Sequence, residues 1–338
     1  MSNSSPEPSP LLFFENVNAY QRTAALKGAI ELDLFSAIGA GAETAAELVA
    51  KCDASERGIR ILCDYLVVHR FLTKEGDRYR LTPDSAIFLT RESQAYLGAA
   101  TEFLLSSMLA DAFRDIAGAV RKGGTVVSAE GTVAPDHPVW VKFARGMSGF
   151  MTMPAQLMAK LIEADPESRL KVLDIAAGHG MFGIAVAQRF PHAEIVALDW
   201  PNVLEVAKEN AEKAGVGDRY STLAGSAFEV EFGSNYDVVL IPNFLHHFDE
   251  ATCVSLLKKV HGALADDGRV VTVEFVPNED RISPPDAAAF SLVMLASTPQ
   301  GDAYTFNELE RMLRQAGFSR TELHDLPPTP QRLLISEK

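Results

Sequence analysis

Basic residues and cysteines are both scarce in this chain of 338 residues. Lys and Arg number 31 against 45 Asp and Glu, which gives a formal net charge of −14 at pH 7. Because phosphate binding requires clustered Lys and Arg, this balance argues against a nucleic-acid substrate. The three cysteines, Cys52, Cys63 and Cys253, match neither a disulfide framework nor the spacing of a zinc site. We expect them to be reduced residues of the core.

Long apolar stretches are also missing. No segment approaches the roughly 18 uninterrupted apolar residues of a membrane span, although 47% hydrophobic residues suffice for full cores. The stretch from Met1 to Pro10 is polar and rich in Pro and Ser, without the basic region and apolar core of a signal peptide. The sequence therefore predicts a cytoplasmic protein with a frayed N-terminus and no membrane partner.

The first hundred residues predict a winged helix. Leu11 to Ile38 is helical in pattern, and Thr44 to Glu47 forms a capping box that opens a short helix. Ser55 begins a second helix, and the segments Phe71 to Lys74 and Arg78 to Thr82 flank a Gly turn as two strands. Residues 1–98 carry 10 Lys and Arg against 13 Asp and Glu. Phosphate would attract them little, so we expect a dimerisation scaffold here and no DNA binding.

Connecting helices are predicted over Ala99 to Gly124 and over Val139 to Ile162. Plain core packing would account for any single apolar residue of the second helix. Taken as a set, they are candidates for the wall of a binding pocket, because flexible Met side chains suit such a surface. The candidates on this helix are Phe143, Met147, Phe150 and Met151.

From Leu170 onward the pattern alternates strands with helices, which predicts a parallel sheet. Polar or glycine-rich signals end five successive predicted strands. Ligands of doubly wound sheets bind at the carboxyl ends of the strands, so these signals predict one site. The signals are Asp174 with the turn Ala176 to Gly180, then Asp199, Ser226, Asn243 with His246, and Glu274.

Two ligands compete for this site. Gly178, Gly180 and Gly183 fit the dinucleotide fingerprint G-x-G-x-x-G, and Asp199 follows about 20 residues later. A pyrophosphate, however, favours helix N-terminal amides without a carboxylate beside them, and Asp174 directly precedes the turn. S-adenosylmethionine (SAM) carries an ammonium and a sulfonium, which a carboxylate attracts. We therefore expect SAM, with Asp199 accepting hydrogen bonds from its ribose hydroxyls.

These motifs together resemble class I SAM-dependent O-methyltransferases, in particular the branch with caffeic acid, acetylserotonin and hydroxyneurosporene methyltransferases. The likeness rests on the run Val172 to Asp199, on Leu198-Asp199-Trp200-Pro201, on Gly225 to Phe228 and on Leu245 to Glu250. It covers nearly the whole chain. It implies a Rossmann-like seven-stranded sheet with an antiparallel final strand, and an N-terminal winged-helix domain that forms a homodimer. We expect parts at residues 1–98, 99–165 and 166–338.

The resemblance also implies which residues hold the cofactor. Relatives usually carry glycine at positions 176 and 177, and the two alanines here are tolerable if their φ values are negative. Ser226 replaces an acid that many relatives place near the adenine. The expected SAM-binding residues are Asp174, Ala176, Gly178, Gly180, Asp199, Trp200, Ser226, Ala227, Phe228 and Asn243.

A catalytic pair is expected beside the cofactor. A phenol of pKa about 10 loses its proton to an imidazole near 6.5 at a cost of about 5 kcal/mol, and a neighbouring carboxylate reduces that cost. His246 occupies the position of the family's base, and Glu274 that of its carboxylate partner. The acceptor would be a hydroxyl group of a small aromatic molecule, and Phe290 and Met294 join the candidates for its pocket.

Some questions stay open at this level. Plant relatives carry a second Glu beside the base, where this chain has Ala303 next to Asp302. Methyl transfer to nitrogen or carbon, or SAM binding without O-methyl transfer, are therefore alternatives. The role of His247 is open as well. His246, His247 and Asp249 could be considered as metal ligands, but adjacent histidines rarely face one ion, and we expect no metal.

Overall fold

The computed structural model describes residues 8–133 and 138–338, and the chain divides into two compact units, Met1–Thr101 and Glu102–Lys338. Part of the N-terminal segment that was expected to fray, residues 1–7, lies outside the described residues. Among the residues described, no helix combines the length and the apolar character that a bilayer crossing requires. The finer division at residues 98 and 165 stays a prediction.

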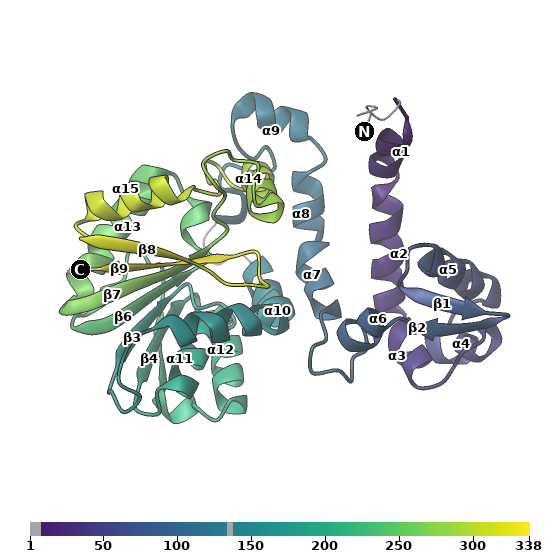
Figure 1. Cartoon of the computed structure of the whole chain (residues 1–338), viewed down its shortest axis with the longest axis horizontal. Coiled ribbons are helices and arrows are strands. Elements are labelled where there is room, and N and C mark those ends of the chain that lie inside the picture. Colours follow the sequence, from purple (N-terminus) through teal and green to yellow (C-terminus); the bar gives the residue numbers. More distant parts are fainter. Residues whose placement is uncertain (1–7, 134–137) are drawn as a thin grey trace, which may run out of the picture. The chain divides into compact units, whose positions relative to one another are not determined.

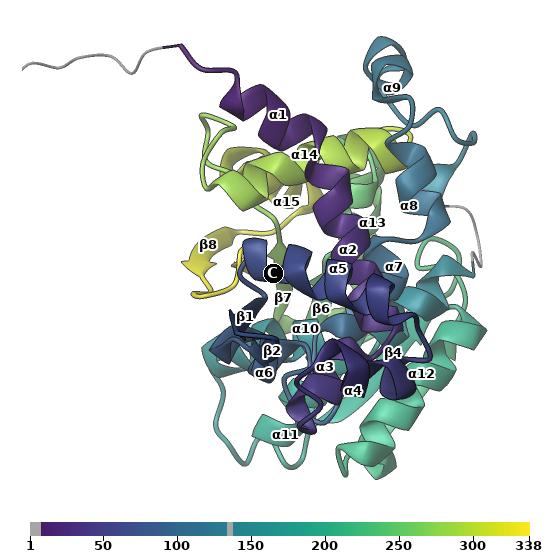
Figure 2. The same ribbon diagram turned by 90° about the vertical axis from the view of Figure 1, so that its right-hand side faces the viewer.

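The first unit consists of helices and one hairpin (Figures 1 and 2). In chain order its elements are α1 (Leu11–Val17), α2 (Ala19–Glu31), α3 (Leu34–Gly39), α4 (Ala45–Cys52), α5 (Glu56–Val68), β1 (Leu72–Glu75), β2 (Arg78–Leu81), α6 (Pro83–Phe88) and the short 3-10 helix η1 (Gly98–Ala100).

Local signals explain most of these boundaries. Thr44 and Glu47 form the expected reciprocal capping box at the start of α4, and Ser55 accepts from the Gly58 N–H at the start of α5. The continuous helix expected over residues 11–38 is broken at two places. Asp33 breaks it most sharply, because its φ of 52° lies in the left-handed region between α2 and α3.

The core of this unit gathers apolar side chains from α2 to α5 and from the hairpin, including Leu34, Phe35, Leu48 and Tyr79. Both views show α1 at the end of α2 that lies away from α3, α4 and the hairpin (Figures 1 and 2). None of the residues of α1 is buried.

The second unit is an α/β domain that begins with short helices. Its elements before the sheet are α7 (Thr101–Leu104), α8 (Ser107–Ala112), α9 (Ile116–Lys122), η2 (Gly131–Val133) and α10 (Val139–Leu161). The elements of the sheet region are β3 (Lys171–Ile175), α11 (Met181–Arg189), β4 (Glu194–Asp199), α12 (Pro201–Lys213), η3 (Gly217–Arg219), β5 (Tyr220–Ala224), β6 (Tyr236–Pro242), η4 (Leu245–His247), α13 (Glu250–Ala263), β7 (Leu264–Glu274), α14 (Pro285–Ser297), α15 (Phe306–Ala316), β8 (Arg320–Asp325) and β9 (Arg332–Glu337).

The sheet has seven strands in the order β5-β4-β3-β6-β7-β9-β8. Strands β3 to β7 are parallel, and β9 pairs antiparallel with both β7 and β8. Helices α13 and α15 cover one face, and α10, α11 and α12 lie on the other (Figure 1). Because both faces are covered, the central strands are apolar almost throughout, as in Val172, Leu173 and Ile175, which have no exposed surface. The predicted seven-stranded fold is confirmed.

The order of the strands determines where a ligand site is expected. Chain order reverses between β3 and β6, where one half of the sheet runs to β4 and β5 and the other to β7. In such sheets the crevice for a ligand opens where the order reverses, outside the carboxyl ends of the strands. We call the carboxyl ends of β3, β4, β6 and β7 the site edge. Asp199, Asn243 and Glu274 end or follow strands there, as the sequence predicts.

Candidate functional site

A glycine turn links β3 to α11 at the site edge. Gly178 and Gly180 have φ values of 57° and 78°, which L side chains rarely adopt. A Cβ on Gly180 would lie 2.6 Å from the hydroxyl oxygen of Tyr220 and 3.2 Å from the Cβ of Ala207. The turn is closed by a hydrogen bond of 2.7 Å from the Gly180 N–H to the Ala177 carbonyl. Glycine is thus required at position 180 for both conformation and space.

Ala176 departs from the expectation for this turn. Its φ is 54°, in the left-handed region, so the condition of a negative φ, under which an alanine is readily tolerated, is not met at this position. Ala177 lies outside that region. An alanine in a left-handed conformation brings its Cβ close to the following carbonyl oxygen, which costs roughly 1–2 kcal/mol. The sequence missed this strain because only the three-dimensional path of the turn sets φ.

Asp199 ties the end of β4 to the glycine turn. Its Oδ2 accepts from the Gly178 N–H at 2.8 Å, and its Oδ1 accepts from the Trp200 N–H at 2.7 Å. Burial raises the pKa of this carboxyl to about 6, although both hydrogen bonds oppose the rise. The side chain is only partly buried, so the lone pairs that remain can accept from a ligand.

Asp174 lies behind the turn with no exposed surface. Its Oδ2 accepts from the Gly183 N–H at 3.0 Å, while its Oδ1 and the buried Tyr220 hydroxyl have no hydrogen-bond partner among the described residues. Burial raises the pKa of Asp174 to about 7; the Gly183 N–H opposes the rise and the charge of Asp199 adds to it. The geometry favours support of the turn over direct lining of the crevice. The sequence did not single out Tyr220.

The residues expected around an adenine differ in how they are placed. Ser226 accepts from the Phe228 N–H at 3.2 Å. Ala227 is 5% exposed, and its carbonyl accepts from the ammonium of Lys259 at 3.0 Å. Phe228 is 40% exposed and contacts Phe248 edge to face at a centroid distance of 5.0 Å. Of this segment, Ser226 and Phe228 therefore present side chains that a ligand could reach.

Trp200 lies between the end of β4 and the start of α12, where it is the N-cap residue. It packs beside a small buried cluster of Ala144, Val203 and Val206, so α10 and α12 meet directly beyond Asp199. The indole is partly buried. Trp200 thus contributes packing at the site edge in addition to the backbone N–H that Asp199 binds.

Asn243 lies at the end of β6 with a left-handed φ of 52°. Its Nδ2 lies 3.9 Å from the sulfur of Met151, and the Nε2 of Gln331 lies at the same distance from that sulfur. The amide oxygens of both residues are buried without a hydrogen-bond partner among the described residues. The structure therefore brings Met151 to the site edge, together with Gln331, which the sequence did not identify.

His246 and Glu274 meet as predicted by their positions after adjacent strands. The Nδ1 of His246 lies 2.5 Å from Oε2 of Glu274, and the two residues are 4% and 2% exposed. Oε1 of Glu274 accepts from the N–H groups of Phe244 and Leu245 at 3.0 and 2.8 Å. The carboxylate of Glu274 thus binds both the backbone of the turn after β6 and the ring of His246 in that turn.

The contact with Glu274 determines which ring nitrogen can react. A carboxylate accepts a proton donor, so Nδ1 of His246 carries the hydrogen and the neutral ring leaves Nε2 without one. Nε2 makes no hydrogen bond to any residue that the structure describes. His246 can therefore accept a proton at Nε2, and Glu274 stabilises the imidazolium that results.

His247 and His179 are both held neutral. Burial lowers the pKa of His247 well below its usual range, with His246 as a second cause, and burial lowers that of His179 to about 4. The ring of His247 meets Trp140 edge to face at 5.4 Å. The Nδ1 of His179 accepts from the Met181 N–H at 3.1 Å. His247 therefore belongs to the aromatic packing beside the base.

Three of the six expected pocket residues lie against the site. Phe143 stacks on His179 at 5.7 Å, and its ring would be 3.4 Å from a Cβ on Gly178. Phe290 meets His246 edge to face at 4.9 Å and stacks on Phe275 at 4.0 Å. Met151 adjoins Asn243. Of the other three, Met147 and Met294 are buried and Phe150 is 37% exposed.

Within residues 8–133 and 138–338, no three His, Cys, Asp or Glu side chains gather in a way that could hold a metal ion. Asp302 makes no hydrogen bond or ion pair with His246 among these residues. Its carboxylate pairs with Arg281 at 3.3 Å and accepts from the Ala303 N–H at 2.8 Å.

The strain at Ala176 predicts that Ala176→Gly stabilises the protein by about 1 kcal/mol, because glycine adopts a left-handed φ without steric cost. For a unit of this size that corresponds to a rise in melting temperature of about 2–4 °C. Differential scanning calorimetry measures it. The control, Ala177→Gly, should lower the melting temperature, and a fall for Ala176→Gly as well would contradict the assignment of strain.

The buried carboxyl of Asp174 predicts a dependence of stability on pH. Its folded pKa of about 7 exceeds the ordinary value near 3.9. The folded state therefore binds the proton more tightly, and the free energy of unfolding falls as pH rises between these values. The substitution Asp174→Asn removes this pH-dependent loss of stability, because an amide does not titrate. The stability of the variant relative to the unchanged protein should grow from pH 4 to pH 7 and then level. Urea unfolding across this range tests it, and a constant difference would exclude the titration.

Comparison with known proteins identifies the family. A model described as the O-methyltransferase domain matches residues 107–319, and one described as the O-methyltransferase dimerisation domain matches residues 14–91. The 3-hydroxy-5-methyl-1-naphthoate 3-O-methyltransferase of Streptomyces sahachiroi is 28% identical over 316 residues, which are 92% of this chain and 90% of that protein.

Solved structures that resemble this chain also carry the names of methyltransferases. A Nostoc punctiforme protein provisionally named an O-methyltransferase is 58% identical, with a TM-score of 0.94 over 98% of this chain and 100% of its own. Human N-acetylserotonin methyltransferase in complex with SAM shares the fold, at 22% identity and a TM-score of 0.85 over 100% and 99% of the two chains. The resemblance inferred from the motifs is confirmed, and the chain belongs to the SAM-dependent O-methyltransferase family.

Proposed function

We propose that this protein transfers the methyl group of SAM to a hydroxyl of a small aromatic molecule, with His246 as general base and Glu274 as the carboxylate that orients it. The observation that carries the proposal is the buried contact of 2.5 Å between His246 Nδ1 and Glu274. It leaves Nε2 as the basic nitrogen, at the same edge of the sheet as the glycine turn and Asp199.

The residues at the donor side fit SAM. Asp199 has lone pairs left to accept from both ribose hydroxyls, and Gly178 and Gly180 keep the turn free of side chains. Ser226 and Phe228 would lie near the adenine, and the orphaned Oδ1 of Asn243 can accept from an ammonium. Ala176, Trp200 and Ala227 shape the site through the backbone and packing, with Asp174 as a support behind the turn.

The acceptor side is apolar and aromatic. Bound SAM supplies a methyl carbon activated by the adjacent sulfonium. Phe290 and Met151 would hold the acceptor ring, with Phe143, Met147, Phe150 and Met294 as further wall residues. His246 removes the hydroxyl proton at Nε2, which for a phenol of pKa about 10 is uphill by about 5 kcal/mol before Glu274 contributes. The naphthoate named for the Streptomyces relative is an aromatic acceptor of this class.

The proposed enzyme is a homodimer that forms through the first unit. Leu11, Leu12, Phe13 and Phe14 are between 54% and 71% exposed on α1, and Val17 is 52% exposed. Exposed apolar area of this extent marks an interaction surface, and the dimerisation model that matches residues 14–91 begins in α1. We place the enzyme in the cytoplasm, because its three free cysteines are buried and unpaired by disulfides.

The base assignment predicts that His246→Ala lowers kcat by about 10²–10⁴-fold. Glu274→Gln should lower kcat to a similar extent, because an amide whose oxygen accepts from Phe244 and Leu245 turns its NH2 group toward Nδ1 and so moves the ring hydrogen to Nε2. Rates are measured with SAM and the best acceptor from a screen of phenols, catechols and amines. His192→Ala is the control, since His192 pairs with Glu167 at 3.2 Å on the surface. If His246→Ala keeps the full rate on a phenol, His246 only positions the acceptor.

The cofactor assignment predicts that Asp199→Asn weakens SAM binding by at least tenfold, because an amide accepts from the ribose hydroxyls less well than a carboxylate. Isothermal titration calorimetry with SAM and with its demethylated product gives the affinities. Asp237→Asn is the matched control, because Asp237 also accepts a backbone N–H at 2.7 Å but lies at the start of β6. Absence of binding by the unchanged protein would remove the proposed function.

A further inference from the structure

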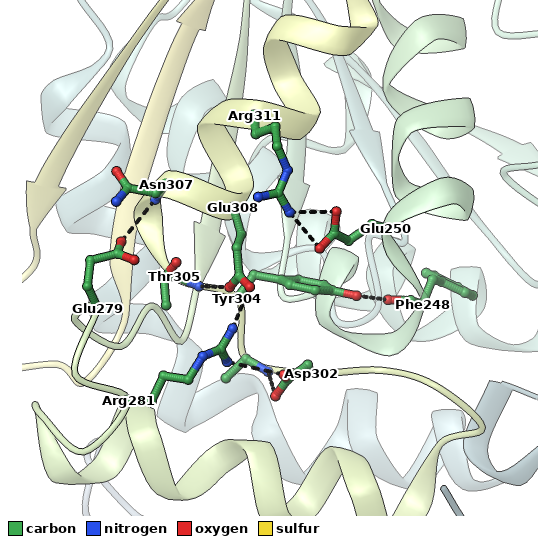
Figure 3. A network of polar contacts seen from close by, with 11 residues as sticks. Phe248, Glu250, Glu279, Arg281, Asp302, Tyr304, Thr305, Asn307, Glu308 and Arg311 are labelled. Carbon is green, nitrogen blue, oxygen red and sulfur yellow. Dashed lines mark hydrogen bonds and ion pairs between the residues drawn. The ribbon is translucent and has the colours of Figure 1, made fainter. Parts of the chain in front are cut away.

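The turn that carries His246 is held from two sides. On the sheet side Glu274 binds the N–H groups of Phe244 and Leu245 as well as the ring of His246. On the outer side lies the segment Gly301–Arg311, which runs from the loop after α14 into α15 (Figure 3). We call the turn His246–Glu250 the base turn.

The outer segment contacts the base turn at three points along its length. The backbone of Gly301 adjoins the carbonyl of His246, the hydroxyl of Tyr304 donates to the carbonyl of Phe248 at 2.6 Å, and Arg311 binds both carboxylate oxygens of Glu250 at 2.7 Å. Figure 3 shows the last two contacts side by side. The three contacts fall on alternate residues of the base turn.

Gly301 is the closest of these contacts. A Cβ at this position would lie 2.2 Å from the carbonyl oxygen of His246 and 2.9 Å from the carbonyl carbon of His247. Backbone therefore packs directly on backbone, and any larger residue would displace either the segment or the base. The Gly301 N–H donates to the Thr298 hydroxyl at 2.9 Å, which fixes the approach.

Tyr304 provides the central contact from a buried position. It is 7% exposed, and burial raises the pKa of its hydroxyl above the usual range, so the group remains a proton donor. The Phe248 carbonyl that accepts its hydrogen bond is two residues beyond the base. The ring packs in the same core cluster as Leu245 and Cys253, on either side of the base turn in sequence.

Arg281 fixes the conformation of the outer segment. It comes from the loop between β7 and α14 and binds both Asp302 and Glu308. Glu308 also caps the N-terminus of α15 through the Thr305 N–H at 2.8 Å. The carboxylate of Asp302, next to Ala303, is therefore engaged by Arg281 and by the Ala303 N–H (Figure 3).

We propose that Gly301 and Tyr304 are positioning residues for His246, and that their backbone-directed contacts supply the second side of support that a carboxylate at position 303 would otherwise give. The inference rests on the proposed function of His246. Ala303 itself has no exposed surface and no polar side chain. Glu274 thus aligns the ring of His246, and the segment Gly301–Arg311 holds the backbone carbonyls of the base turn.

The test compares two tyrosines whose hydroxyls make the same kind of hydrogen bond at different places in the structure. Tyr304→Phe removes a buried hydroxyl that donates to a backbone carbonyl at 2.6 Å, and Tyr236→Phe removes one that donates to the Phe232 carbonyl at 2.7 Å, at the opposite end of β6. We expect Tyr304→Phe to lower kcat about tenfold with an unchanged affinity for SAM. Tyr236→Phe should leave both unchanged, even where it lowers the melting temperature.

A second measurement needs no acceptor. The proton between His246 Nδ1 and Glu274 should give a far-downfield resonance in NMR spectra of protein labelled at histidine nitrogen. Tyr304→Phe and Gly301→Ala should shift or broaden this signal, whereas Tyr236→Phe should not. Identical kcat and spectra for the two tyrosine variants would overturn the proposal.

The parallel variant His246→Ala separates the two hypotheses. If this variant keeps the full rate, the proposed role of His246 as base is wrong, whatever Tyr304→Phe does. If it loses activity while Tyr304→Phe behaves like Tyr236→Phe, the base stands and the positioning role of the outer segment is wrong.

Discussion

The contact between Glu274 and the turn after β6 is the interaction on which the site depends. A carboxylate that is 2% exposed requires strong hydrogen-bond partners, because burial of an unpaired charge is very costly. Glu274 meets this requirement with three donors at once, the N–H groups of Phe244 and Leu245 and the Nδ1–H of His246. The same bonds that make the carboxylate tolerable in the core therefore fix the tautomer and the direction of the histidine.

On the side of the expected SAM site, the cost of burying two carboxylates is met in a different way. Asp174 and Asp199 end neighbouring strands, and burial raises the pKa of both, to about 7 and about 6. Without a ligand these carboxyls hold protons more tightly than in water. A cationic ligand at the turn would favour the charged forms and so offset part of the desolvation cost. The two carboxyls at and behind the turn thus favour a sulfonium over a pyrophosphate, which agrees with the family to which the chain belongs.

The two sides meet because the sheet reverses its order between β3 and β6. The glycine turn and Asp199 come from the half that runs to β5, whereas Asn243, His246 and Glu274 come from the half that runs to β7. Helix α10 passes over this junction, with Phe143 against Gly178 and Met151 against Asn243. Residues that are far apart in the chain, from the glycine turn to Glu274, therefore lie at one edge of the sheet, where a ligand crevice is expected.

The sequence by itself determined the features that depend on near neighbours. The capping box at Thr44, the alternation of strands and helices, and the polar residues that end the strands all follow from patterns within a few residues. The pair His246 and Glu274 was also predictable, because adjacent parallel strands bring their ends together. Tertiary structure alone decided that Ala176 is left-handed, that Asp174 is fully buried and that Asp302 turns to Arg281. The bond from Tyr304 to the Phe248 carbonyl spans 56 residues. No local pattern encodes such a contact, since it exists only once both segments have been placed by the core between them.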